Sequence, residues 1–264
     1  MLEWSLYLAL GAIAGLLAGL LGVGGGLIIV PVLAALFVQQ GMASDIIMHL
    51  ALGTSLASIA FTSLSSIRAH QKHGAILWPA FLQLTPGIML GAALGGWVAG
   101  MMTTAWLKPL FAVFELSVAL HMLLSVETQA HRPATGRAGM TGAGGIIGLI
   151  SSLVGIGGGT LTVPWLVWNS MPLRQAIATS AACGLPIAIA GSISYIVNGW
   201  QQPSLPAHTL GYVHLPAFIG IVISSVLFAP LGARLTQSLP VTTLKKIFGG
   251  LLLLLGTKLL LSEI

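Results

Sequence analysis

The stretch GLLAGLLGVGGGLIIVPVL at residues 15–33 decides the fold, because a close copy, GLISSLVGIGGGTLTVPWL, recurs at residues 148–166. Ten of the 19 aligned positions are identical, at a constant offset of 133 residues. Shorter matches follow both copies in the same order: Thr54-Ser55 with Thr179-Ser180, and Pro79-Ala80-Phe81 with Pro216-Ala217-Phe218. Chance similarity between apolar segments does not preserve order, so the pattern predicts a duplicated unit.

The composition around these copies is that of a membrane protein. Of the 264 residues, 56% are apolar and only 6% are charged, and the mean hydropathy is +0.99. A soluble domain carries about 25% charged residues, so this chain has too few to cover a soluble surface. The single cysteine, Cys183, excludes a disulfide scaffold and a Cys-based zinc site. We therefore expect an all-α polytopic membrane protein.

The chain divides into two halves at its most polar stretch, Glu127–Arg137, which lies close to the midpoint. Each half supplies four apolar runs long enough for a membrane crossing, which needs about 20 residues. These runs cover residues 4–38, 46–67, 75–101, 106–126, 139–169, 175–198, 209–233 and 243–261. The predicted division is a first transmembrane repeat at 1–126, a polar linker at 127–138 and a second transmembrane repeat at 139–264.

The first run of each half is too long for a single crossing. Residues 4–38 number 35, and their middle reads GVGGG at 22–26. Each glycine costs about 1 kcal/mol relative to alanine inside a helix. The run at 139–169 has the same feature, GIGGG, at 155–159. We predict that each long run breaks at its glycines and returns to the side from which it started.

The basic residues favour inverted halves. If all eight runs crossed once, the ten Lys and Arg residues would divide five against five. If the first run of each half folds back, eight share one side, and only Lys108 and Lys258 lie opposite. The eight are Arg68, Lys72, Arg132, Arg137, Arg174, Arg234, Lys245 and Lys246. Basic residues collect on the cytoplasmic side, so the split predicts inverted repeats with both termini outside the cytoplasm.

Inverted repeats with broken helices are typical of secondary transporters, whose site lies near the midplane. A new half-helix begins after each break, at Leu27 and Thr160, and its free N–H groups suit a small anion. Glycine also serves close helix packing, which is the preferred role for Gly11, Gly15, Gly19, Gly91 and Gly95. The candidate substrate-binding residues are the break glycines and nearby hydroxyls: Gly24, Gly25, Gly26, Thr54, Ser55, Gly157, Gly158, Gly159, Thr160, Thr179 and Ser180.

Glu115 lies inside an apolar run, FAVFELSVAL. A buried acid in a membrane is costly, which makes Glu115 a candidate for proton coupling. An interfacial or helix-packing carboxylate is an equally open interpretation. The repeat counterpart is Leu252, so any role of Glu115 is confined to one half. We expect no catalytic residue, metal site or cofactor, since no nucleophile–base pair and no histidine pair with metal-ligand spacing is found. An intramembrane enzyme is therefore disfavoured. A membrane scaffold is also disfavoured, because it would need no symmetric glycine breaks.

The motif G-x-G-G-G-x-x-x-V-P occurs at residues 22–31 and 155–164, and A-x-G/A-T-S follows at 51–55 and 176–180. With these motifs the chain resembles the TauE/SafE family of sulfite and organosulfonate exporters over essentially its whole length. The resemblance implies a multi-pass protein of the bacterial inner membrane, and the charge split then makes both termini periplasmic. It also implies a small sulfur-containing anion as substrate, such as sulfite or sulfoacetate, without fixing the substrate or the direction.

The expected function is therefore secondary transport that exports a small sulfur oxyanion or sulfonate by alternating access around a midplane site. The alternative is an uptake transporter or a channel-like facilitator for another small anion. The expected partners are the anion, the lipid bilayer and a second copy of the chain in a homodimer, with no nucleic acid.

Overall fold

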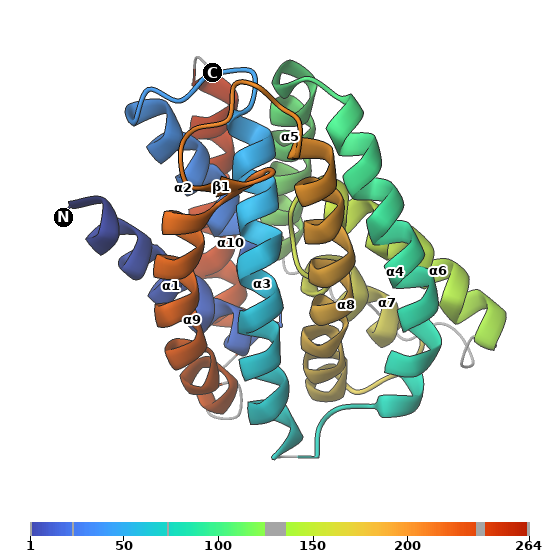
Figure 1. The fold of residues 1–264 in the computed structure, drawn as a ribbon. Coiled ribbons are helices and arrows are strands. Elements are labelled where there is room, and N and C mark those ends of the chain that lie inside the picture. The colour runs from blue at the N-terminus through green and yellow to red at the C-terminus, as the bar shows by residue number, and fades with distance from the viewer. Residues whose placement is uncertain (1, 23, 73, 125–135, 236–240, 263–264) are drawn as a thin grey trace.

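The computed structural model describes residues 2–22, 24–72, 74–124, 136–235 and 241–262, and helices dominate this part of the chain (Figure 1). The first half contains α1 (Leu2–Leu21), α2 (Gly26–Gln39), α3 (Ile47–Gln71), α4 (Trp78–Met101) and α5 (Thr104–Leu123). The second half contains α6 (Arg137–Leu153), α7 (Gly159–Trp168), α8 (Leu173–Gly199), α9 (Leu215–Leu235) and α10 (Val241–Leu261), with the short strands β1 (Thr209–Leu210) and β2 (Val213–His214). The all-α fold is confirmed.

Both long apolar runs break at their glycines, as predicted. The first run divides into α1 and α2, and the second into α6 and α7. Gly24 and Gly25 have φ angles of 79° and 82°, and Gly155 has a φ of 64°. These left-handed conformations are open to glycine but costly for other residues, which is why the helices end here. In Figure 1, α2 leads back up to the end where α3 begins, and α7 leads back down to where α8 begins.

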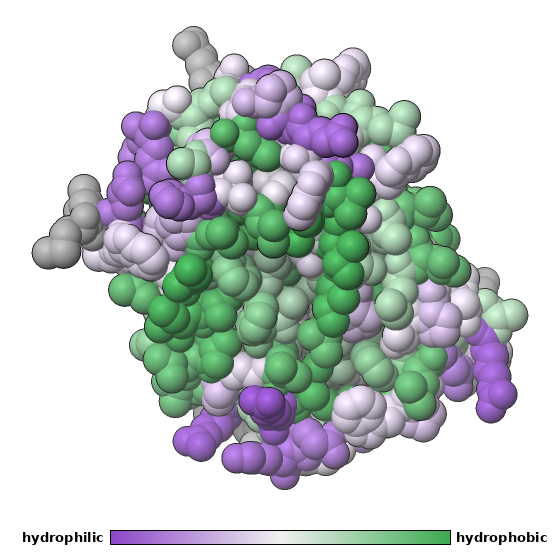
Figure 2. Space-filling model, viewed as in Figure 1, coloured by the Kyte–Doolittle hydropathy of each residue, from purple (hydrophilic) through white to green (hydrophobic). Residues whose placement is uncertain are grey.

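Six helices within the described residues are long and apolar enough to cross a membrane: α1, α3, α4, α5, α8 and α9. Figure 2 shows a broad apolar band between two hydrophilic ends, the arrangement that a bilayer requires. Inside the band α3 and α8 are the most buried of these helices. The protein is therefore a multi-pass membrane protein with α3 and α8 at its centre.

Helix packing is the same when the two halves are exchanged. Helix α1 packs on α9, and its counterpart α6 packs on α4; α3 packs on α8, and α5 packs on α10. Helices α3 and α8 run in opposite directions (Figure 1), so that Gly53 lies by Tyr195 while Gly184 lies by Ser63. The central pair thus brings equivalent segments of the two halves together in antiparallel orientation.

Glycine makes the closest helix contacts. A Cβ at Gly15 would overlap the backbone of Ser225 on α9, and a Cβ at Gly91 would overlap the backbone of Gly145 on α6. Gly11, Gly19 and Gly95 make equally close contacts with the same two helices. Small residues permit such close approach in membrane helices. The packing role predicted for these five glycines is confirmed.

One apolar run contains a hairpin that the sequence did not reveal. The run at 209–233 opens with β1 and β2, paired antiparallel as Thr209 with His214 and Leu210 with Val213. Helix α9 begins only at Leu215. Pro216 in its first turn has no N–H and would clash with a helical carbonyl four residues earlier, so the helix cannot extend upstream. Most of the predicted linker, at 127–138, lies outside the described residues, and the domain division stays a prediction.

Candidate functional site

The two glycine breaks contact each other directly. A Cβ added at Gly24 would lie 2.9 Å from the Cα of Gly157, and one added at Gly26 would lie 2.5 Å from the carbonyl oxygen of Gly155. These glycines are buried. A side chain at either position would therefore push the two breaks apart. Glycine, which has no Cβ, allows the two backbones to pack directly against each other.

The break in the second half leaves backbone donors unused. Among the described residues, the N–H groups of Gly159, Thr160 and Leu161 have no hydrogen-bond acceptor. They belong to the first turn of α7, where the helix itself offers no partner. Such a turn carries a partial positive charge and aligned N–H groups, which favour a bound anion.

Unpartnered hydroxyls lie on the last turn of α6 and the first turn of α7, the two helices on either side of the same break. Thr162 and Ser151 are fully buried, and their hydroxyl oxygens have no hydrogen-bond partner in the part of the chain described. The hydroxyls of Ser152 and Thr160 share this lack of a described partner. A Cβ at Gly158 would lie 3.1 Å from the Thr162 Oγ1, so this hydroxyl adjoins the break. Buried polar groups normally have partners, which makes this cluster an exception.

The first half has no equivalent cluster. The four hydroxyl residues correspond, at the offset of 133, to apolar residues or glycine: Ala18, Gly19, Leu27 and Ile29. The region around the breaks is therefore polar on one side. The candidate residues named from the sequence include Thr160 but not Ser151, Ser152 or Thr162. Comparing the two copies position by position would have identified all of them.

The serine of each Thr-Ser pair borders the break of the other half. Ser55 Oγ donates a hydrogen bond of 2.8 Å to the carbonyl oxygen of Gly155. Ser180 Oγ donates to Ile177 in its own helix, and a Cβ at Gly22 would lie 2.7 Å from this hydroxyl. Both serines thus lie beside the breaks, and their part in substrate binding stays a prediction.

The threonine of each pair accepts a hydrogen bond from the backbone just before a helix of the other half. Thr54 Oγ1 accepts a 2.9 Å hydrogen bond from the His214 N–H, immediately before α9. Thr179 Oγ1 accepts one of the same length from the Leu77 N–H, immediately before α4. Leu77 and His214 are repeat counterparts, so each half caps a helix of the other. These contacts engage both hydroxyls in the fold, while leaving their protons available to a ligand.

Glu115 lies apart from this cluster, between α5 and α10. Its side chain is fully buried, and neither carboxylate oxygen has a hydrogen-bond partner in the described residues. A Cβ at Gly256 of α10 would lie 3.4 Å from the Glu115 Oε2. The structure therefore joins the break residues to one another and leaves Glu115 as a separate feature. No group of three His, Cys, Asp or Glu side chains in the described ranges is arranged to hold a metal ion.

Comparison with known proteins agrees with the fold and the motifs. The family model described as "Sulfite exporter TauE/SafE" matches residues 7–259. A probable membrane transporter protein of Haemophilus influenzae is 40% identical over 97% of this chain and 98% of its own length. A probable membrane transporter protein of Methanocaldococcus jannaschii is 28% identical over 97% of this chain and 95% of its own. No solved structure matches the chain. The chain is therefore a membrane transporter and belongs to the TauE/SafE family.

Proposed function

We propose that the protein exports a small sulfur-containing anion, such as sulfite or an organosulfonate like sulfoacetate, through a site at the paired glycine breaks. The observation that carries this proposal is the first turn of α7, with its unused N–H groups beside the unpartnered hydroxyl of Thr162. The description of the matching family, a sulfite exporter, supports the choice of substrate.

The chemistry of the breaks suits an oxyanion. Backbone N–H groups and hydroxyls donate hydrogen bonds to charged oxygens without supplying a fixed positive charge. A site that lacks a full cation binds the anion less tightly and releases it more easily. The membrane potential of a negative-inside cell favours anion export by about 2.3 kcal/mol per charge per 100 mV, so export needs no nucleotide.

The arrangement of the helices suits alternating access. The breaks lie between the two halves, and each half caps a helix of the other through Thr54 or Thr179. We propose that one repeat moves against the other around the breaks, which opens the site to each side in turn. In this proposal the halves are inverted, both termini are periplasmic in the inner membrane, and the basic ends of α3 and α9 face the cytoplasm.

Glu115 supplies a candidate for coupling. Its carboxyl has no partner in the described residues, and the second half has Leu252 at this position. We propose that Glu115 takes up a proton in one conformation and releases it in the other. The carboxylate would then link proton movement to the rearrangement of α5 against α10.

The test is anion flux in proteoliposomes that contain the purified protein. Sulfite, sulfate, thiosulfate, sulfoacetate, taurine and acetate are offered singly, with and without an imposed potential. Saturable flux of sulfite or a sulfonate, faster when the potential drives the anion outward, is the expected result. Flux that fails to saturate indicates a channel-like facilitator, and flux of acetate alone contradicts the sulfur assignment. Absence of flux for every sulfur anion contradicts the proposal.

A further inference from the structure

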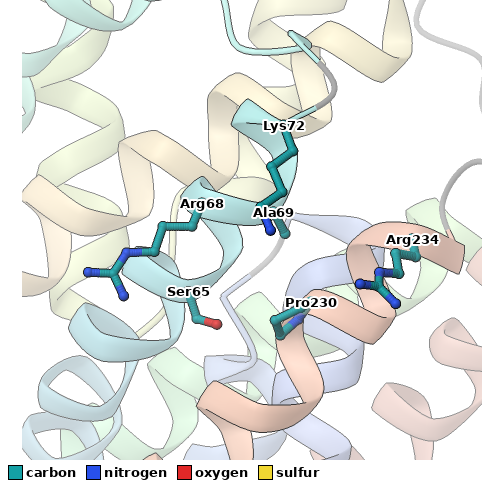
Figure 3. Close-up of a pocket in the computed structure, with 6 residues that line it drawn as sticks. All are labelled: Ser65, Arg68, Ala69, Lys72, Pro230 and Arg234. Atoms are coloured by element: carbon teal, nitrogen blue, oxygen red, sulfur yellow. The ribbon is translucent and has the colours of Figure 1, made fainter.

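A second polar feature lies far along α3 from the breaks, between the last turns of α3 and α9. It is a cavity of about 160 Å³, shown in Figure 3. Its lining comes from both halves of the protein: Ser65, Arg68, Ala69 and Lys72 of α3, with Pro230 and Arg234 of α9. The volume is sufficient for an ion with three or four oxygens.

The cavity is strongly basic. Three of its six lining residues are cationic, and none is acidic. In Figure 3 the side chains of Lys72 and Arg234 extend from their two helices into the space between α3 and α9, whereas the Arg68 guanidinium extends away from Arg234. None of the three cationic side chains makes an ion pair or hydrogen bond with any residue that the structure describes. Positive charges held together without counter-ions attract an anion.

The fold itself does not require these charges. The repeat-equivalent groove lies between α8 and α4, where Arg68, Lys72 and Arg234 correspond to Ile193, Val197 and Trp97. These three counterparts are exposed apolar residues, as expected for contact with lipid. The equivalent pairs α3–α9 and α8–α4 therefore both pack together. The three basic residues of the cavity occur only at the α3–α9 pair.

A series of hydroxyls connects the cavity to the breaks. Along α3, Ser58 and Thr62 lie between Ser55 at the break and Ser65 at the cavity, at helical spacings of three or four residues. All four are buried. Thr62 Oγ1 forms a 2.7 Å hydrogen bond with the Ser225 Oγ of α9, within the interface that forms the cavity. The rise per residue of a helix makes the path from Ser55 to Ser65 about 15 Å long.

This series is also specific to one half. Ser58, Thr62 and Ser225 correspond to Cys183, Ile187 and Ile88. All three counterparts are fully buried in the α8–α4 side of the protein. Ser58 and Thr62 each donate a hydrogen bond to a backbone carbonyl four residues earlier, so both hydroxyls are satisfied within the fold. What distinguishes this half is that its hydroxyls line the interface below the basic cavity.

We propose that this cavity is a loading site, where Lys72 and Arg234 bind the oxyanion group of the transported anion before it moves along the α3–α9 interface to the breaks. The proposal rests on the proposed function, because it assumes that a sulfite-like or sulfonate anion is the cargo. Cations at the rim of a site mainly speed the capture of an anion and make it sensitive to salt. Their loss therefore weakens capture and leaves the later steps intact.

The experiment compares a Lys72→Gln/Arg234→Gln double variant with Arg174→Gln in phosphatidylcholine proteoliposomes. Arg174 is exposed at the start of α8 and does not line the cavity, so it controls for loss of charge. Sulfite is offered from each side in turn. From the side of the α3 and α9 ends, the double variant is expected to raise the half-saturating concentration about tenfold, with a maximal rate within about twofold of wild type. High salt is expected to reduce this difference.

Three results would overturn the loading site. One is an unchanged half-saturating concentration in the double variant while wild type transports sulfite, which leaves the proposed function intact. Another is equal impairment in a charge-preserving Lys72→Arg/Arg234→Lys variant, which points to a structural effect. The third is an effect confined to vesicles with added phosphatidylglycerol, which assigns the cavity to a lipid headgroup. If wild type transports no sulfur anion, both proposals fail together.

Discussion

The hydroxyl of Ser55 donates a 2.8 Å hydrogen bond to the carbonyl oxygen of Gly155, and this contact joins α3 of the first half to the glycine break of the second. Gly155 adopts a left-handed backbone conformation, with a φ of 64°, in which its carbonyl has left the ladder of α6. The Ser55 hydroxyl replaces the missing helical donor. A side chain on one half therefore helps to hold the break of the other.

Replacing Ser55 with alanine is expected to destabilise the protein by about 1 kcal/mol, because the carbonyl of Gly155 loses its buried donor. Thermal unfolding in detergent measures the change. Ser180→Ala is the matched control, since Ser180 Oγ donates within its own helix to Ile177, three residues earlier. A loss in Ser180→Ala as large as that in Ser55→Ala would contradict the special role of the contact between halves.

Removing the hydroxyl of Thr162 separates a functional role from a structural one. Thr162→Val keeps the shape of a buried side chain whose hydroxyl has no described partner, so stability is expected to stay level or rise. Transport of the anion is expected to fall at least tenfold. Flux assays and unfolding of the same preparation test both points. Normal flux in Thr162→Val would remove this hydroxyl from the site.

Thr54→Val is expected to lower the stability of the protein, in contrast to Thr162→Val. Thr54 Oγ1 accepts the N–H of His214, and valine would leave that N–H without its acceptor at the start of α9. The expected loss of stability is about 1–3 kcal/mol. Thr179→Val should behave alike, because Thr179 holds the N–H of Leu77 in the same way. If neither variant loses stability in thermal unfolding, the caps contribute nothing to the fold.

The motifs in the sequence predicted the helix breaks because glycine has a direct local effect on the backbone. They also named Ser55 and Ser180 as candidate substrate-binding hydroxyls, and the structure places both beside the breaks. Sequence could not show that Thr54 and Thr179 bind backbone N–H groups, because those donors lie 160 and 102 residues away along the chain. The cationic residues Arg68, Lys72 and Arg234 were interpreted only as topology signals, since their cavity exists only when α3 packs on α9.

Glu115→Gln tests proton coupling with little change of shape. In wild type, an imposed pH gradient is expected to alter the rate of anion flux, and in Glu115→Gln this response is expected to vanish because an amide does not titrate. Glu115→Leu introduces the residue found at the repeat counterpart, Leu252. This variant is expected to raise the stability of the protein, because it removes a buried carboxyl. A pH response in Glu115→Gln equal to that of wild type would assign Glu115 to helix packing.

Two glycines on neighbouring helices give a matched test of the close contact between α4 and α6. Gly91→Ala would drive a Cβ into the backbone of Gly145, so a loss of about 1–3 kcal/mol is expected. Gly142→Ala, on α6, meets no atom within 4 Å and should stabilise the helix by up to about 1 kcal/mol. Thermal unfolding of both variants decides, and equal effects would contradict the close α4–α6 contact.

Cysteine labelling tests the inversion of the repeats. Lys72 follows α3 and Gln201 lies just after α8, so the two positions come after equivalent helices, and both side chains are exposed. The native Cys183 is fully buried and gives a low background. We expect an impermeant thiol reagent to label Gln201→Cys in intact cells, and to label Lys72→Cys only in inverted vesicles. Inverted repeats place equivalent positions on opposite faces, whereas parallel repeats place them on one. Labelling of both variants from the same side would therefore contradict the inversion, and a C-terminal reporter found in the cytoplasm would contradict the predicted orientation.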